Sequence, residues 1–283
     1  MTRNHWRRAV SHVIIVLCGL SVVIALIPLA LVLFYVMAQG ITSLNLSFFT
    51  EMPKPVGEVG GGMANAIVGS IIVTLLGAMF AIPIGIMSGV YAAEYTGTRM
   101  ASAVRFAADT LNGVPSIVIG VFIYSIAVLP LRRFSALAGG LALGVMMIPL
   151  IMRTTEELLL LVPATLREGA LALGATRARA VFTVVVPAAL PGILTGILLA
   201  LARIAGETAP LLFTALNNRF FSTDVRQPIS TLTVQVFIYA TAPYQDWHRQ
   251  AWAGALVLVT MVLICSLLAR VATARMEKLH RGS

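Results

Sequence analysis

Arg203 and Glu207 are the residues whose types and spacing best suit anion chemistry in this sequence. Four residues apart, they would share one face of a helix and could form an ion pair. The guanidinium of Arg203 stays charged and offers two parallel N–H donors, which fits a tetrahedral oxyanion. Glu207 would restrain the arginine while no anion is bound. The alternative is a salt bridge that only stabilises the end of a helix.

Residue patterns typical of enzymes are missing. No HExxH, GxSxG, paired-cysteine or Walker A motif occurs, and the glycine run at 60–62 is not followed by Lys-Ser/Thr. The histidines fall in the tails or in a loop, at His5, His12, His248 and His280. We therefore expect no catalytic residue, no metal site and no cofactor. Any ATP-driven work would need another chain to hydrolyse the ATP.

The composition places these residues in a membrane. Of the 283 residues, 59% are apolar and only 11% are charged, against about 25% charged in a soluble domain. The net charge of +9 could suggest a nucleic-acid partner. The basic residues lie between apolar runs, however, as they do in membrane proteins. We therefore expect contact with membrane lipid and no nucleic-acid partner.

Six apolar runs are long enough, or nearly so, to cross a bilayer as helices, which need about 20 residues each. They cover 13–38, 64–91, 107–130, 136–152, 184–206 and 251–271. The first is too long for a signal-peptide core of about 7–15 residues, so it is interpreted as a retained helix. The sequence predicts an all-α membrane protein with six transmembrane helices over 13–272 and tails at 1–12 and 273–283.

The distribution of Lys and Arg predicts the orientation of these spans. With six spans both tails share a side. That side collects 13 basic residues, twelve of them in the tails and the 92–106 and 153–183 loops and one, Arg270, at the end of the sixth span. The opposite side collects six, namely Lys54, Arg132, Arg133, Arg219, Arg226 and Arg249. The positive-inside rule then places both termini in the cytoplasm. Arg203 is left within a span, where a charge costs at least about 2.5–3.5 kcal/mol, so we expect it to face a polar interior.

Small residues predict close helix packing. Three Gly-x-x-x-Gly pairs lie within the spans, at Gly85 with Gly89, Gly140 with Gly144, and Gly192 with Gly196. Such pairs let helix backbones approach closely in lipid.

The most informative cytoplasmic loop is 153–187. Thr165 and Glu168 form a capping box after Pro163, so a short helix should start there. Gly174 supplies a break, and residues 176–182 could form a second short helix that carries Arg177 and Arg179. Two short helices joined at a glycine would project from the membrane for another protein to bind. An ordinary capped loop is the alternative.

This loop resembles the EAA signature of ABC importer permeases, EAA-x3-G-x9-I-x-LP. The matching residues are Glu168-Gly169-Ala170, Gly174, Val184, Val186 and Pro187, with Gly169, Val184 and Val186 as the departures. In that family the segment docks into a cleft of a cytoplasmic ATPase and transmits its closure to the membrane helices. The resemblance implies an ATPase-coupling role for Thr165, Glu168, Gly169, Ala170, Gly174, Arg177, Arg179 and Pro187 over a coupling loop at 163–187.

Three further stretches are similar to the phosphate-specific permeases of that family, at 113–120, 148–163 and 201–224. The last, with ARIAGETAPLLFTA, is the most specific. The resemblance implies a type I importer permease of MetI-like architecture in the bacterial cytoplasmic membrane. It also implies three partners: a second permease, two copies of an ATPase, and a periplasmic phosphate-binding protein.

Arg153 has two interpretations. It could be an ordinary cytoplasmic anchor at the end of the fourth span, with Glu156 or Glu157 as a partner. The family resemblance raises it as a second contact for the transported anion. The external segment 207–250 also has two interpretations. Its short apolar stretches fit either a re-entrant segment or the surface to which the binding protein docks.

Two other functions compete with phosphate import. A permease of the same class for phosphonate, sulfate or molybdate would use the same arginine chemistry, and only the 201–224 stretch argues against it. A secondary transporter or channel would need no ATPase and would have no use for the loop around Gly174.

Overall fold

The computed structural model describes residues 2–58 and 60–281, and within them every regular element is a helix. Five helical segments are long and apolar enough to cross a membrane. They contain α1 (Thr2–Ile41), α3 (Ala64–Glu94), α7 (Ala136–Leu160), α10 (Val186–Ile204) and α13 (Gln245–Arg281). These correspond to five of the six predicted spans. The helices run further than predicted at both ends of the chain, and of the predicted tails only residues 1 and 282–283 lie outside the described part.

The third predicted span, 107–130, is not one straight helix. The chain forms α4 (Arg99–Gly113) and then α5 (Ser116–Ile123), a π-helical turn η1 (Tyr124–Val128) and α6 (Leu129–Leu131), with a bend of 104° between α4 and the rest. Pro115 causes the break, because its ring forces the preceding residue out of the helical region. Val114 accordingly has an extended backbone with ψ of 128°. The sixth crossing exists only if this bent pair counts as one.

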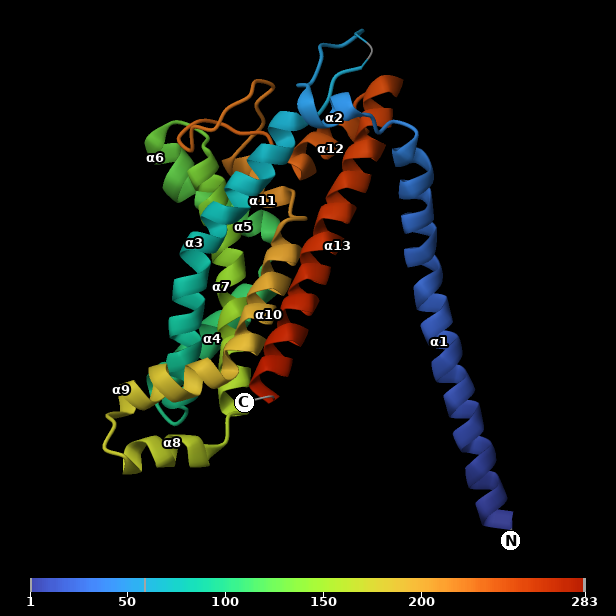
Figure 1. Cartoon of the computed structure of the whole chain (residues 1–283). Coiled ribbons are helices and arrows are strands. Elements are labelled where there is room, and N and C mark those ends of the chain that lie inside the picture. Colours follow the sequence, from blue (N-terminus) through green and yellow to red (C-terminus); the bar gives the residue numbers. More distant parts are fainter. Residues whose placement is uncertain (1, 59, 282–283) are drawn as a thin grey trace.

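Helices α3 and α7 form the centre of the body, and glycines set how closely they approach (Figure 1). A Cβ added at Gly85 would lie 2.8 Å from Ile151 Cβ, and one at Gly140 would lie 2.6 Å from Leu76 Cβ. Gly192 and Gly196 of α10 face Leu158 and Thr154 of α7 in the same way. The predicted role of the Gly-x-x-x-Gly pairs in helix packing is confirmed.

The segment 207–250 folds back onto the body. It contains α11 (Ala209–Thr214) and α12 (Leu232–Thr241), and residues 229–235 between and within them are buried. The chain before α12 also contacts the start of α7. The backbone N–H groups of Ala136 and Leu137 donate to the carbonyls of Gln227 and Val225, each at 3.0 Å. The segment is therefore packed against the bundle, and both of its predicted roles stay predictions.

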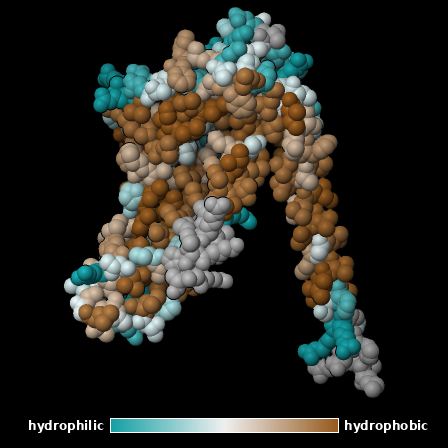
Figure 2. Space-filling view, viewed as in Figure 1, coloured by the Kyte–Doolittle hydropathy of each residue, from teal (hydrophilic) through white to brown (hydrophobic). Residues whose placement is uncertain are grey.

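Helix α1 stands away from the rest of the body (Figure 1). Its apolar window is 0% buried, and it joins α13 near its own C-terminal end, where the rings of Tyr35 and Trp252 lie 5.2 Å apart. A broad band of hydrophobic residues crosses the visible face of the molecule, with hydrophilic residues at both ends (Figure 2). Helix α1 begins, and α13 ends, toward the same end of the molecule as α8 and α9 (Figure 1).

Candidate functional site

Arg203 lies in the last turn of α10, and its side chain is exposed. It lines an open groove of about 510 Å³ between α7 and α10. Thr154 and Thr195 are the other polar residues of the groove, and the remainder of the lining is glycine, alanine and leucine. The structure thus places the predicted anion-binding arginine in an elongated and otherwise mostly apolar depression.

The predicted pairing of Arg203 with Glu207 is wrong. Helix α10 ends at Ile204, and the chain turns there, with the N–H of Glu207 bonded to the carbonyl of Ile204 at 3.0 Å. A spacing of four brings side chains together only while the helix continues. Neither side chain forms an ion pair or hydrogen bond within residues 2–58 and 60–281. Arg203 therefore faces the groove without an internal counter-charge.

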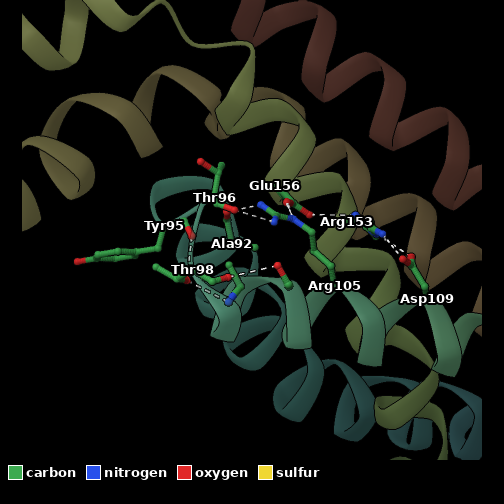
Figure 3. A network of polar contacts seen from close by, with 10 residues as sticks. Ala92, Tyr95, Thr96, Thr98, Arg105, Asp109, Arg153 and Glu156 are labelled. Carbon is green, nitrogen blue, oxygen red and sulfur yellow. Dashed lines mark hydrogen bonds and ion pairs between the residues drawn. The ribbon is translucent and has the colours of Figure 1, made fainter.

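Arg153 is held by carboxylates instead of facing that groove (Figure 3). Its Nε donates to Asp109 Oδ1 at 2.9 Å, its Nη2 pairs with the other oxygen of Asp109, and its Nη1 donates to Glu156 Oε2 at 3.2 Å. Of the two partners predicted on its own helix, Glu156 is found and Glu157 is not. A second role for Arg153, as an anion contact, stays a prediction.

Glu156 sits at the centre of this network. Its side chain is only 4% exposed, and it also pairs with Arg105 of α4. Arg105 donates further to the carbonyls of Ala92 at 2.8 Å and Thr96 at 3.2 Å, where α3 ends (Figure 3). Helix α7 continues to Leu160, past the end of the predicted span at residue 152, and the network lies on this extension. Its charged residues are neutralised by contacts between α4 and α7.

Arg105 and Asp109 were not recognised from the sequence as part of a site. A signal was present, because they lie four apart on α4 and so share a face. That face meets the similarly spaced Arg153 and Glu156 of α7.

The coupling loop forms the two predicted short helices, α8 (Ala164–Ala172) and α9 (Arg177–Ala180). Gly174 separates them with a φ of +85°, in the left-handed region that favours glycine. Thr176 caps α9 by accepting from the N–H of Arg179 at 3.3 Å. Helix α9 then continues through a π-helical turn, η2 (Val181–Val185), into α10, where Pro187 lies in the first turn.

The predicted capping box is wrong. Helix α8 begins two residues earlier than a capping box at Thr165 requires, with Pro163 in the N-cap position, and no side chain caps it. The carbonyl of Pro163 accepts the first bond of the turn, from the N–H of Leu166 at 3.2 Å. Thr165 is therefore inside the helix, where its hydroxyl cannot cap the first turn.

Two arginines fasten this segment to the end of α3. Arg167 donates to Glu94 Oε1 at 3.0 Å and to the carbonyls of Leu159 and Val162. Arg177 donates to the carbonyl of Glu94 at 2.9 Å, and its guanidinium lies 5.0 Å from the centre of the Tyr95 ring.

The rest of the segment projects. Glu168 and Gly169 are exposed, Ala170 is half-buried, and the side chain of Leu173 is 91% exposed. The two arginines thus leave a largely free surface on α8 and α9.

Comparison with known proteins gives this architecture a context. Residues 81–279 match the family of binding-protein-dependent transport system inner membrane components. The phosphate transport system permease protein PstA of Yersinia pestis is 45% identical over 274 residues, which cover 96% of this chain and 93% of that protein. Its namesake in Haemophilus influenzae is 43% identical, covering 93% of each chain.

Solved structures of similar fold are chains of ABC transporters. An inward-facing MetNI methionine ABC transporter chain superposes with a TM-score of 0.58 at 20% identity, covering 76% of this chain and 94% of its own. A chain of an amino acid ABC transporter with histidines gives 0.58 at 17% identity, covering 75% and 92%. These likenesses confirm the predicted all-α, MetI-like fold.

Proposed function

Because this chain belongs to the family of binding-protein-dependent transport system inner membrane components, we propose that it is the permease subunit of an ATP-driven importer of inorganic phosphate. Like its relatives it is a multi-pass membrane protein and a transport component. It would form the translocation path with a second permease. Two copies of a cytoplasmic ATPase would bind its coupling segment, and a periplasmic phosphate-binding protein would deliver the anion to the opposite end. Both termini would be cytoplasmic.

The observation that carries the coupling proposal is the projection of α8 and α9. Their exposed residues offer the ATPase a surface, while Arg167 and Arg177 connect them to α3, and η2 connects them to α10. A movement of the segment during ATP binding would therefore reach two spans directly. Alternating access would follow if those spans shift against α7.

The phosphate assignment is supported by the relatives and by Arg203. An arginine without a counter-charge attracts an oxyanion, and its fork of donors can form two charge-assisted hydrogen bonds with it. Its position in the last turn of α10, which has 19 residues, puts it about 25 Å along the helix from Pro187. The arginine would thus receive the anion far from the ATPase.

Uptake of labelled phosphate tests the proposal. The chain and its partner subunits would be expressed in cells that lack their own phosphate importers. We expect uptake, and we expect Arg203→Ala to abolish it while the complex still assembles and hydrolyses ATP. Arg8→Ala, which removes an exposed arginine of α1 remote from the groove, is the matched control and should transport normally. Normal uptake by Arg203→Ala would contradict the role of this arginine.

The two competing functions predict different results in the same assay. An importer of another oxyanion would take up sulfate or molybdate, and these would compete with phosphate. A transporter that uses no ATPase would tolerate Gly174→Trp, which distorts the turn between α8 and α9. We expect that sulfate and molybdate do not compete with phosphate, and that Gly174→Trp abolishes phosphate uptake.

A further inference from the structure

We infer that Thr154 and Thr195 make the groove selective for an oxyanion that still carries a proton. The inference rests on the proposed function and deepens it, because it concerns which tetrahedral anions can pass Arg203. Both threonines line the groove on facing helices, Thr154 on α7 and Thr195 on α10.

The hydroxyl hydrogen of each threonine is already used. Thr154 Oγ1 donates to the carbonyl of Leu150, and Thr195 Oγ1 donates to the carbonyl of Pro191, each at 2.9 Å. A carbonyl oxygen can only accept, so the direction of both bonds is fixed. A hydroxyl has one hydrogen and two lone pairs, which leaves each of these oxygens as an acceptor and nothing else.

The two acceptors lie at the same level of the groove. Gly196, next to Thr195, faces Thr154 so closely that an added Cβ would be 2.3 Å from Thr154 Cγ2. Arg203 is seven residues further along α10, about 10 Å away along the helix axis. An anion that moves along the groove from Arg203 would thus meet two hydroxyl oxygens next, within a lining that is otherwise apolar.

An arginine followed by two acceptor oxygens distinguishes protonated oxyanions from fully deprotonated ones. Inorganic phosphate near neutral pH keeps one or two of its protons, so it can donate an O–H to a threonine oxygen. Sulfate and molybdate carry no proton under these conditions, and their oxygens would face acceptors that offer them no hydrogen. An acceptor that a bound anion covers and leaves unmatched is costly, which is how a site built for a donor rejects an analogue that lacks one.

Uptake by valine variants is the first test. Thr195→Val and Thr154→Val keep the shape of the side chain and remove the acceptor oxygen. We expect each to lower phosphate uptake about tenfold, the equivalent of one hydrogen bond of about 1.4 kcal/mol. Thr195→Ser, which keeps the oxygen, should restore most of the uptake that Thr195→Val loses. The matched control is Thr260→Val on α13, an exposed threonine outside the groove whose hydroxyl also donates four residues back, to Leu256.

Direct protection of the groove is the second test, and it needs neither ATP nor a binding protein. A cysteine at Leu199, which lines the groove and is 48% exposed, would be introduced after replacing Cys18 and Cys265 by serine. Its reaction with a thiol reagent would be followed in membranes that hold the full importer. Phosphate should slow the reaction. Monofluorophosphate, a dianion of similar shape without an O–H at neutral pH, should not, and Thr154→Val with Thr195→Val should remove the difference.

Two outcomes would overturn the inference: normal phosphate uptake by the double valine variant, or equal protection by phosphate and monofluorophosphate. Either can occur in an importer that transports phosphate, so the proposed function would survive. If the unaltered importer takes up no phosphate at all, the proposed function fails, and the inference fails with it.

Discussion

Glu94, at the end of α3, accepts a hydrogen bond of 3.0 Å from the Nε of Arg167 on α8. The carboxylate is only 6% exposed, while the arginine also donates to two backbone carbonyls at the end of α7. A single arginine therefore connects the projecting segment to both α3 and the end of α7.

Arg167→Ala should loosen the α8–α9 segment without unfolding the spans. It leaves the buried carboxylate of Glu94 without its partner, at a cost of about 1–3 kcal/mol, so the segment should open about tenfold more often. Limited proteolysis with chymotrypsin would report this as faster cleavage near Leu166 to Leu173. Arg179→Ala is the control, because that side chain is exposed on α9 and forms no hydrogen bond or ion pair within the described residues. Equal cleavage of the two variants would contradict the fastening role.

Glu156→Ala should destabilise the protein far more than Asp109→Ala. The side chain of Glu156 is 4% exposed and neutralises two arginines, whereas that of Asp109 is 56% exposed. Loss of a buried partner costs about 3–5 kcal/mol, and loss of a solvated one costs about 1 kcal/mol or less. Thermal unfolding of the detergent-purified importer would rank the two. Glu157→Ala, on the same turn but exposed, should leave Tm unchanged, and a reversed ranking would refute the proposed arrangement of charges.

Alanine should have opposite effects at the two glycines of the coupling segment. Gly169 lies within α8 with nothing within 4 Å of an added Cβ, so Gly169→Ala should stabilise the helix by about 1 kcal/mol. Gly174 has a φ of +85°, and Gly174→Ala should cost about 1–2 kcal/mol. Hydrogen exchange of the α8 amides would measure both, as slower exchange in the first variant and faster exchange in the second. Faster exchange of the α8 amides in Gly169→Ala would contradict the prediction that alanine stabilises this helix.

Gly69→Ala should prevent normal packing at the other end of the molecule. An added Cβ would lie 1.9 Å from the carbonyl oxygen of Ser230, a backbone atom that cannot move without displacing the chain before α12. Overpacking of this kind costs about 1–3 kcal/mol or more. Gel filtration of the purified protein should show a reduced monodisperse fraction. Gly19→Ala on α1 is the control, since nothing lies within 4 Å of its added Cβ, and a normal profile for Gly69→Ala would argue against this contact.

The sequence predicted the long spans well because apolar length is a local property. It failed where a distant contact decides the outcome. The break at Val114 was signalled by Pro115, but the apolar run continued past it and was read as one helix. Helix α7 continues to Leu160, past the apolar run that ends at residue 152, and the contacts of Arg153 and Glu156 with Arg105 and Asp109 depend on α4 lying beside it.

The candidate site shows the same division. Arg203 stands out in the sequence because Arg270, at the very end of the sixth run, is the only other basic residue within the predicted spans. Its pairing with Glu207 was predicted on the assumption that the helix continues, whereas it ends at Ile204. Thr154 and Thr195 could not be recognised as a pair from the sequence, since they line one groove only because α7 and α10 lie face to face.

The attachment of helix α1 has a consequence for which of its residues matter. Its apolar window buries nothing, and Tyr35 and Gly40, close to its C-terminal end, supply contacts with Trp252 and Leu256. The family match begins only at residue 81, well after this helix. Within the described part of this chain the first span is therefore held to α13 near its C-terminal end only. Another apolar helix of equal length that keeps the tyrosine and the glycine should preserve these contacts.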